Sequence, residues 1–103
     1  MSDHVRIDRQ VAEMHRVIAE RIRAGNTSIL SQAKSNLARW RAQYGGELPS
    51  AYEEWVKLLE GDIDEVMHAL ESDDENAVRQ RSSSPFTGIL SNAERWEILK
   101  RAS

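Results

Sequence analysis

The chain contains no cysteine among its 103 residues. This absence excludes a disulfide framework, a thiolate metal site and a cysteine nucleophile, and it fits a reducing compartment. No apolar run approaches the roughly 18 residues that a membrane span needs. The start of the chain, Met1–His4, lacks the apolar stretch of a signal peptide. We therefore expect a soluble, cytoplasmic protein that does not contact membranes.

Motifs that carry chemistry are also missing. The three histidines, His4, His15 and His68, do not show the spacing of an HExxH zinc motif. No serine lies in a Gly-x-Ser-x-Gly turn, and no glycine-rich loop could cradle a phosphate. Adjacent carboxylates at 53–54 and 73–74 fall in the first turns of expected helices, where they complement the helix dipole. We therefore expect no catalytic residues, no metal and no cofactor, so that the protein is not an enzyme.

Apolar residues recur with the period of an α-helix through the first 44 residues. One stripe, spaced 4, 3, 4 and 4 residues apart, predicts a helix over residues 3–24 and consists of Ile7, Val11, Met14, Ile18 and Ile22. A second stripe predicts a helix over residues 28–44 and consists of Leu30, Ala33, Leu37, Trp40 and Tyr44. Gly25 and the pair Gly45–Gly46 end these helices. Because the connecting turn is short, we expect an antiparallel hairpin.

Helix-start signals divide the remaining residues. The capping box, in which serine precedes glutamate by three positions, occurs at Ser50–Glu53, Ser72–Glu75 and Ser91–Glu94, with an aspartate variant at Asp62–Glu65. These signals predict helices over residues 51–60, 63–71, 73–81 and 92–102. Segment 82–88 contains Pro85 and Gly88 and is expected to be a loop anchored by Phe86. We interpret Ser84 as an ordinary turn residue, whose replacement by alanine should be nearly silent.

No alternating segment is long enough for a strand. The sequence therefore predicts an all-α fold of about six helices in a single domain over residues 1–103. We expect a long N-terminal helical hairpin followed by a compact bundle of short helices. Most of the bulky apolar residues lie beyond residue 45, among them Tyr52, Trp55, Leu58, Leu59, Val66, Met67, Leu70, Phe86, Trp96 and Leu99. Residues 45–103 should hold the core and fold without residues 1–25.

Charge is distributed unevenly between the two halves of the chain. Residues 1–44 carry eight Lys or Arg against four Asp or Glu, whereas residues 45–103 carry six against thirteen. Separated fields of this kind steer encounters with partners and orient them. The first half is therefore basic and the second half is acidic, and we expect the basic half to meet a partner.

Arginine and apolar residues of the basic half are the candidate partner-binding residues. Arginine is preferred for bidentate recognition of carboxylate or phosphate and for desolvated interfaces. The candidates are Arg9, Val11, Met14, Arg16, Ile18, Ile22, Arg23, Arg39 and Arg41. The apolar stripe of the first helix either packs into its own domain or offers a surface to another protein, and the sequence leaves both open. A small transcriptional regulator that binds DNA through the basic half is the alternative function, and an oligomeric scaffold is a third.

A set of landmarks between Leu37 and Leu99 resembles a family of small bacterial proteins encoded beside toxin genes in toxin–antitoxin modules. The segments that carry the resemblance are 36–40 (Asn-Leu-Ala-Arg-Trp), 54–59 (Glu-Trp-Val-Lys-Leu-Leu), 72–75 (Ser-Asp-Asp-Glu), 83–86 (Ser-Ser-Pro-Phe) and 94–99 (Glu-Arg-Trp-Glu-Ile-Leu). Within that family, the chain is most similar to the partners of zeta-type kinase toxins and of related plant-pathogen effectors with a polynucleotide-kinase-like domain.

The resemblance implies an antitoxin that neutralises a co-encoded toxin or effector by binding it. In zeta-type systems a helix of the antitoxin obstructs the nucleotide pocket of a kinase, and the matching element here would be residues 1–25. That helix lies outside the segment that carries the resemblance. A chaperone role towards the same partner belongs to this hypothesis.

Overall fold

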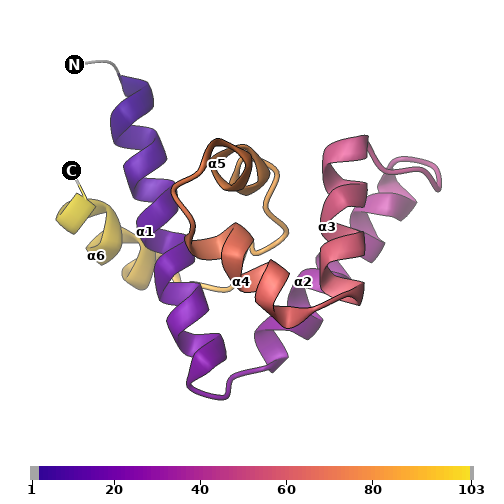
Figure 1. Cartoon of the computed structure of the whole chain (residues 1–103), viewed down its shortest axis with the longest axis horizontal. Helices are drawn as coiled ribbons and strands as arrows, with labels where there is room; N and C mark the ends of the chain where they lie inside the picture. Colours follow the sequence, from indigo (N-terminus) through magenta and orange to yellow (C-terminus); the bar gives the residue numbers. More distant parts are fainter. Residues whose placement is uncertain (1–2, 103) are drawn as a thin grey trace.

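The computed structural model describes the backbone of residues 3–102 and the side chains of residues 8–101. Within this part of the chain the fold is all-α, without a strand, which confirms the predicted fold class (Figure 1). The six helices are α1 (Asp3–Arg23), α2 (Ser28–Gln43), α3 (Ser50–Glu60), α4 (Ile63–Glu71), α5 (Glu75–Arg81) and α6 (Asn92–Ala102). None of the described helices is both long and apolar enough to span a membrane.

Two of the predicted helix-start signals work as expected. At the start of α6, the Ser91 amide donates to the Glu94 carboxylate at 2.9 Å, and the Glu94 amide donates to the Ser91 hydroxyl at 3.1 Å. This reciprocal pair is a complete capping box. At the start of α4, the carboxylate of Asp62 accepts from the backbone amide of Asp64 at 2.9 Å. Both signals therefore satisfy backbone amides that the helix itself leaves without partners.

The other two start signals are wrong in detail. Ser50 is already helical, and Pro49 occupies the N-cap of α3 without a side-chain cap. Proline fits this position because its φ is fixed and it has no N–H to satisfy. At α5 the cap is Asp74, which accepts from the Ala77 amide at 2.7 Å, while the Ser72 hydroxyl donates to Asp74. The carboxylate of Asp74, not the hydroxyl of Ser72, is therefore the N-cap of α5.

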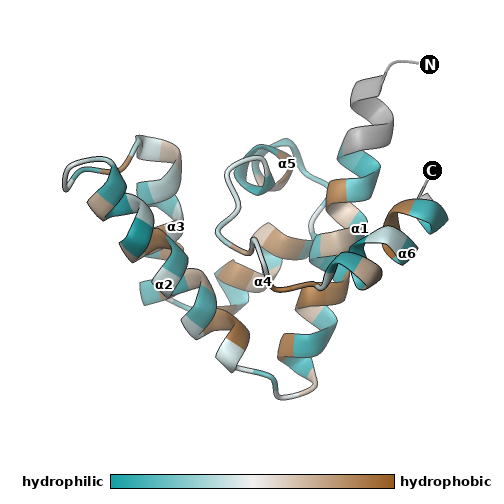
Figure 2. Ribbon diagram, turned by 180° about the vertical axis from the view of Figure 1, so that it is seen from behind, coloured by the Kyte–Doolittle hydropathy of each residue, from teal (hydrophilic) through white to brown (hydrophobic). Residues whose placement is uncertain are grey.

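Helix α1 lies at the centre of the packing. It contacts mainly α4 and α6, then α5, and only lightly α2, which packs against α3. The first two helices are joined by a short turn at Gly25, whose φ is 105°, but they diverge instead of packing along their length (Figure 1). Apolar residues gather on α4 and on the neighbouring parts of α1 and of the segment before α6 (Figure 2). The second half of the chain therefore does not hold the core alone.

The core is centred on Trp55, whose side chain is fully buried. The Trp55 indole N–H donates to the Gln80 carbonyl at 2.8 Å, and the ring meets Phe86 edge-on, with centroids 5.7 Å apart. The remaining large members come from every helix except α5: Ile18, Ile22, Ile29, Leu37, Leu48, Leu59, Val66, Met67, Leu70, Leu90 and Ile98. Phe86 is thus the anchor of its loop, as its position between Pro85 and Gly88 predicts.

The loop between α5 and α6 is fastened to two distant helices. His15 of α1 lies 2.7 Å from the Ser84 hydroxyl through Nε2 and 2.7 Å from the Val11 carbonyl through Nδ1. A carbonyl only accepts, so we assign the proton to Nδ1, and Nε2 then accepts from Ser84. Burial lowers the pKa of His15, which favours this neutral form. On the other side, the Asn36 amide of α2 donates to the carbonyls of Pro85 (2.8 Å) and Thr87 (3.0 Å).

Candidate functional site

The apolar candidates on α1 belong to the protein's own fold. Ile18 and Ile22 are only 2% and 7% exposed and lie in the core. Val11 and Met14 are half-buried, and both border a cavity between α1 and the loop before α6. The question that the sequence left open is therefore settled for Ile18 and Ile22, which are core residues here and offer no surface to a partner. We remove both from the candidate partner-binding set.

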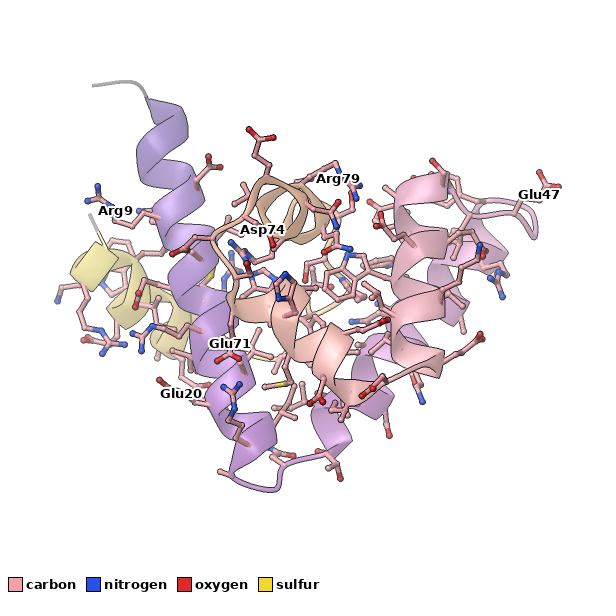
Figure 3. The ribbon with its side chains drawn as sticks, in the orientation of Figure 1. Arg9, Glu20, Glu47, Glu71, Asp74 and Arg79 are labelled. Carbon is pink, nitrogen blue, oxygen red and sulfur yellow. The ribbon has the colours of Figure 1, made fainter. Side chains whose placement is uncertain are left out.

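Two arginine candidates on α1 are engaged within the molecule. Arg16 forms ion pairs with Glu13 at 2.6 Å and with Glu20 at 2.9 Å on the same helix. Arg23 pairs with Glu71 of α4, which lies beside the last turns of α1 (Figure 3). Hydrogen bonds from these arginines lower the pKa of Glu13 and of Glu71. Because every partner is a carboxylate on an exposed surface, these pairs orient side chains more than they stabilise the fold.

Arg9 is the remaining candidate on α1. It is exposed, and it projects from the N-terminal half of the helix (Figure 3). Asp8 and Glu13 lie within one turn of Arg9 along the sequence, so the outer surface of α1 alternates in charge. The part of α1 whose side chains are described, residues 8–23, therefore does not form the expected basic face.

Helix α2 carries the other two candidates and is basic along its whole length. Its 16 residues include Lys34, Arg39 and Arg41 and no Asp or Glu. Lys34 and Arg39 are exposed, and Arg39 donates to the side-chain oxygen of Asn36 at 2.9 Å. Arg41 pairs with Glu53 of α3. The structure thus brings Arg39 and Arg41 onto one helix with a positive field, as the charge of the first half predicts.

An aromatic cluster lies at the C-terminal end of α2. The Trp40 and Tyr52 rings have centroids 5.2 Å apart, and Tyr44 and Tyr52 have centroids 6.5 Å apart. Tyr44 is 56% exposed, whereas Trp40 and Tyr52 are half-buried. Trp40 and Tyr44 are one helical turn apart, and the chain reverses directly afterwards at Gly45–Gly46, where both φ angles are positive. This reversal places Tyr52 of α3 beside them.

A shallow groove runs between α2 and α3 next to this cluster. It encloses about 230 Å³, with Leu37, Val56 and Leu59 along its floor and Lys34, Arg41 and Glu60 at its rim. An apolar floor with a charged rim is the arrangement found in protein–protein interfaces. We call the groove together with Trp40, Tyr44 and Tyr52 the α2–α3 face. Arg39 lies on another side of α2, where it borders a hollow with Asn36, Thr87 and Gly88.

Sequence reasoning assigned Trp40 and Tyr44 to the buried stripe of the second helix and Tyr52 to the core. Trp40 and Tyr52 do pack against the core, whereas Tyr44 is 56% exposed. One signal was available, because an aromatic pair at positions i and i+4 directly before a glycine pair places rings at a helix end. The contribution of Tyr52 depends on the pairing of α2 with α3, which no local pattern encodes.

Trp96 on α6 is a second exposed aromatic residue. It is 64% exposed, but no other aromatic ring contacts it among the described residues. Isolated apolar residues at the surface are common and carry no functional meaning by themselves. The α2–α3 face, which combines three rings with Lys34 and Arg41, is the stronger candidate.

No family model matches the chain, and no curated protein or solved structure matches it either. Within the described residues, no three His, Asp or Glu side chains are grouped as metal ligands. The interpretation of the α2–α3 face therefore depends on its own residues.

Proposed function

We propose that this protein acts by binding a protein partner through the α2–α3 face, not by catalysis. The observation that carries the proposal is the aromatic cluster at the end of α2, in which exposed Tyr44 stands beside the half-buried rings of Trp40 and Tyr52. Tryptophan, tyrosine and arginine are the residue types that dominate binding energy in protein interfaces. Tyr44, which is the most exposed of the three rings, serves as the anchor.

The charge of α2 defines the chemistry of the partner. Lys34 and Arg41 border the groove from a helix without any carboxylate, so they favour a partner surface that presents carboxylates opposite them. Such charges mainly raise the association rate and fix the orientation of the complex. The apolar floor of the groove, at Leu37 and Val56, contributes to affinity once water is displaced.

The same face argues against DNA as the partner. Glu53 pairs with Arg41, and Glu60 lies at the rim of the groove, so carboxylates interrupt the positive surface on the α3 side. A phosphate backbone would be repelled by both carboxylates. A protein surface of mixed charge complements this arrangement better.

We further propose that the partner is a toxin or effector encoded next to this protein, of the nucleotide-binding kinase-like type, and that binding inhibits it in the bacterial cytoplasm. The support is the resemblance of segment 37–99 to antitoxins of such modules, which includes Leu37 and Trp40 of the α2–α3 face. A chaperone role towards the same partner is part of this proposal. The blocking element is then α2 with α3, because Ile18 and Ile22 of α1 lie in the core.

The proposal can be tested by co-expressing the protein with the product of the neighbouring gene and measuring the dissociation constant of the complex. Loss of an interface anchor costs about 2 kcal/mol or more, so Tyr44→Ala should weaken binding by roughly 30-fold. Trp96→Ala is the matched control, because it removes an equally exposed aromatic ring from another helix. It should leave the affinity unchanged.

A second pair of variants tests the charges. Lys34→Glu should slow association, with an effect that shrinks as salt concentration rises, whereas Arg16→Glu on α1 should have little effect. If Tyr44→Ala bound the partner normally and Trp96→Ala did not bind it, the interface would lie on α6, and the proposal of the α2–α3 face would be rejected. If no protein co-purified and the protein bound DNA with an affinity that fell steeply with salt concentration, the alternative function of a DNA-binding transcriptional regulator would be favoured.

A further inference from the structure

A cavity of about 260 Å³ lies between α1, the end of α5 and the segment that leads into α6. It is separate from the α2–α3 face. Its apolar wall is formed by Val11, Met14, Ile18, Phe86 and Leu90. Pockets for drug-sized ligands measure about 300–1,000 Å³, so this cavity suits a smaller molecule.

Two arginines and no carboxylate line the cavity. The cations are Arg81 and Arg95, and the only other titratable group in the lining is His15, which burial favours in its neutral form. The chain as a whole has a net charge of −3. A positive cavity in an acidic protein is therefore a local feature, and it favours an anionic ligand.

Arg81 is unusual because it is a buried cation without an ion-pair partner among the described residues. Its side chain is 5% exposed, and Nη1 donates to the carbonyls of Ala69 (3.0 Å) and Ser72 (2.8 Å). Burial is the main effect on its pKa and lowers it, although Asp73, Asp74 and Asp8 oppose this shift from a distance. Two neutral carbonyls leave most of the charge of a buried guanidinium uncompensated.

The donor atoms of Arg81 are not all used. Nε and Nη2 donate to no described group, yet no buried side-chain nitrogen of the described residues lacks a hydrogen-bond partner. These atoms are therefore not fully buried, and Arg81 borders both this cavity and a neighbouring hollow that Asp8 also lines. A guanidinium with free, adjacent N–H groups is suited to bidentate recognition of a carboxylate.

We propose that this cavity binds a small organic carboxylate with an apolar body, such as a short-chain or simple aromatic carboxylate. The carboxylate group lies at Arg81 and Arg95, and the body packs against Met14, Phe86 and Leu90. The hydroxyl of Ser84 and the imidazole of His15 are already bonded to each other and complete the wall. This site is independent of the α2–α3 face, so either can fail without the other.

Nuclear magnetic resonance on the full chain, labelled with ¹⁵N, tests the proposal. The probes are hexanoate and its neutral analogue hexanamide, which has nearly the same size. Hexanoate should produce saturable shifts of amides in 11–18 and 82–90. Hexanamide should bind at least about tenfold more weakly, because it cannot form charge-assisted hydrogen bonds.

Variants at the two arginines complete the test. Arg81 also holds the end of α4, so its replacement can unfold the protein, and Arg95→Gln is the decisive variant because Arg95 is exposed. Arg95→Gln should weaken hexanoate binding roughly tenfold, whereas the control Arg9→Gln should not change it. Three results each overturn the proposal: no saturation up to about 10 mM hexanoate, equal affinity for the two probes, or unchanged affinity in Arg95→Gln.

Discussion

Replacement of Ser84 by alanine tests how the loop before α6 is fastened. The sequence indicates a silent substitution, but the structure shows the Ser84 hydroxyl bonded to His15 at 2.7 Å and accepting from the Phe86 amide at 3.1 Å. His15 is 6% exposed, so its Nε2 would lose its donor, and only water that enters the adjoining cavity could replace it. Leaving a buried acceptor unsatisfied costs about 1–3 kcal/mol. We therefore expect Ser84→Ala to destabilise the protein by that amount.

Urea denaturation followed by circular dichroism measures this effect. For a protein of this size the urea dependence is about 1–3 kcal/mol per molar, so the midpoint should fall by about 1 M. Ser83→Ala is the matched control, because the neighbouring hydroxyl forms no hydrogen bond to a described residue, and it should stay within about 0.5 kcal/mol of the original protein. If Ser84→Ala and Ser83→Ala were equally stable, the His15–Ser84 bond would have no energetic role.

The pH dependence of the same measurement has a defined sign. Burial lowers the pKa of His15 in the folded state, so the unfolded chain takes up a proton first as the pH falls. Stability should therefore be fully present above about pH 6.5 and decrease below it. Because burial is the largest cause of the shift, Ser84→Ala should show the same decrease. A stability that rises on acidification from neutral pH would contradict the buried neutral imidazole.

Three further outcomes are expected. Deletion of residues 1–25 should abolish cooperative thermal unfolding, since α1 supplies Ile18 and Ile22 to the core, and a clear melting transition of the truncated chain would refute this. Trp55→Ala should cost about 3–5 kcal/mol in chemical denaturation, because the ring is fully buried and its N–H is bonded. The pKa of Asp74 is lowered to about 2, chiefly by the Ala77 amide, so its contribution to stability should be lost as the pH falls from about 4 towards 2. Asp74→Asn should flatten this part of the pH profile, and an unchanged profile would show that the cap does not titrate there.

Helices could be predicted from the sequence because their signals are local. The apolar stripe from Val11 to Ile22 repeats with the period of a helix, and Gly25 follows it closely. The helix bounds predicted from such local signals agree with the structure to within two residues. The caps were harder, because Ser72 and Asp74 are two possible caps only two positions apart. Ser72 accepts from the Asp74 amide, whereas Asp74 accepts from the Ala77 amide at the start of α5. Local pattern therefore predicted the elements better than their first residues.

The arrangement of the helices could not be predicted in the same way. An apolar stripe on α1 shows that one face will be covered, but not that α4 and α6 will cover it instead of α2. Likewise, Arg39 and Arg41 could be identified as a basic feature, whereas the proximity of Tyr52 depends on how α3 folds back. His15 and Ser84 are 69 positions apart, and nothing in either neighbourhood indicates their bond.

The pairing of α1 with α6 joins the first helix of the chain to the last, and Arg21 is ion-paired with Glu94. During synthesis, α1 leaves the ribosome long before α6 exists, and contacts of high sequence separation form late. The apolar side of α1 therefore stays uncovered until α4 has emerged, and it is covered completely only when α6 has joined. A nascent chain arrested before Ile63 would expose Ile18 and Ile22, which the folded molecule buries.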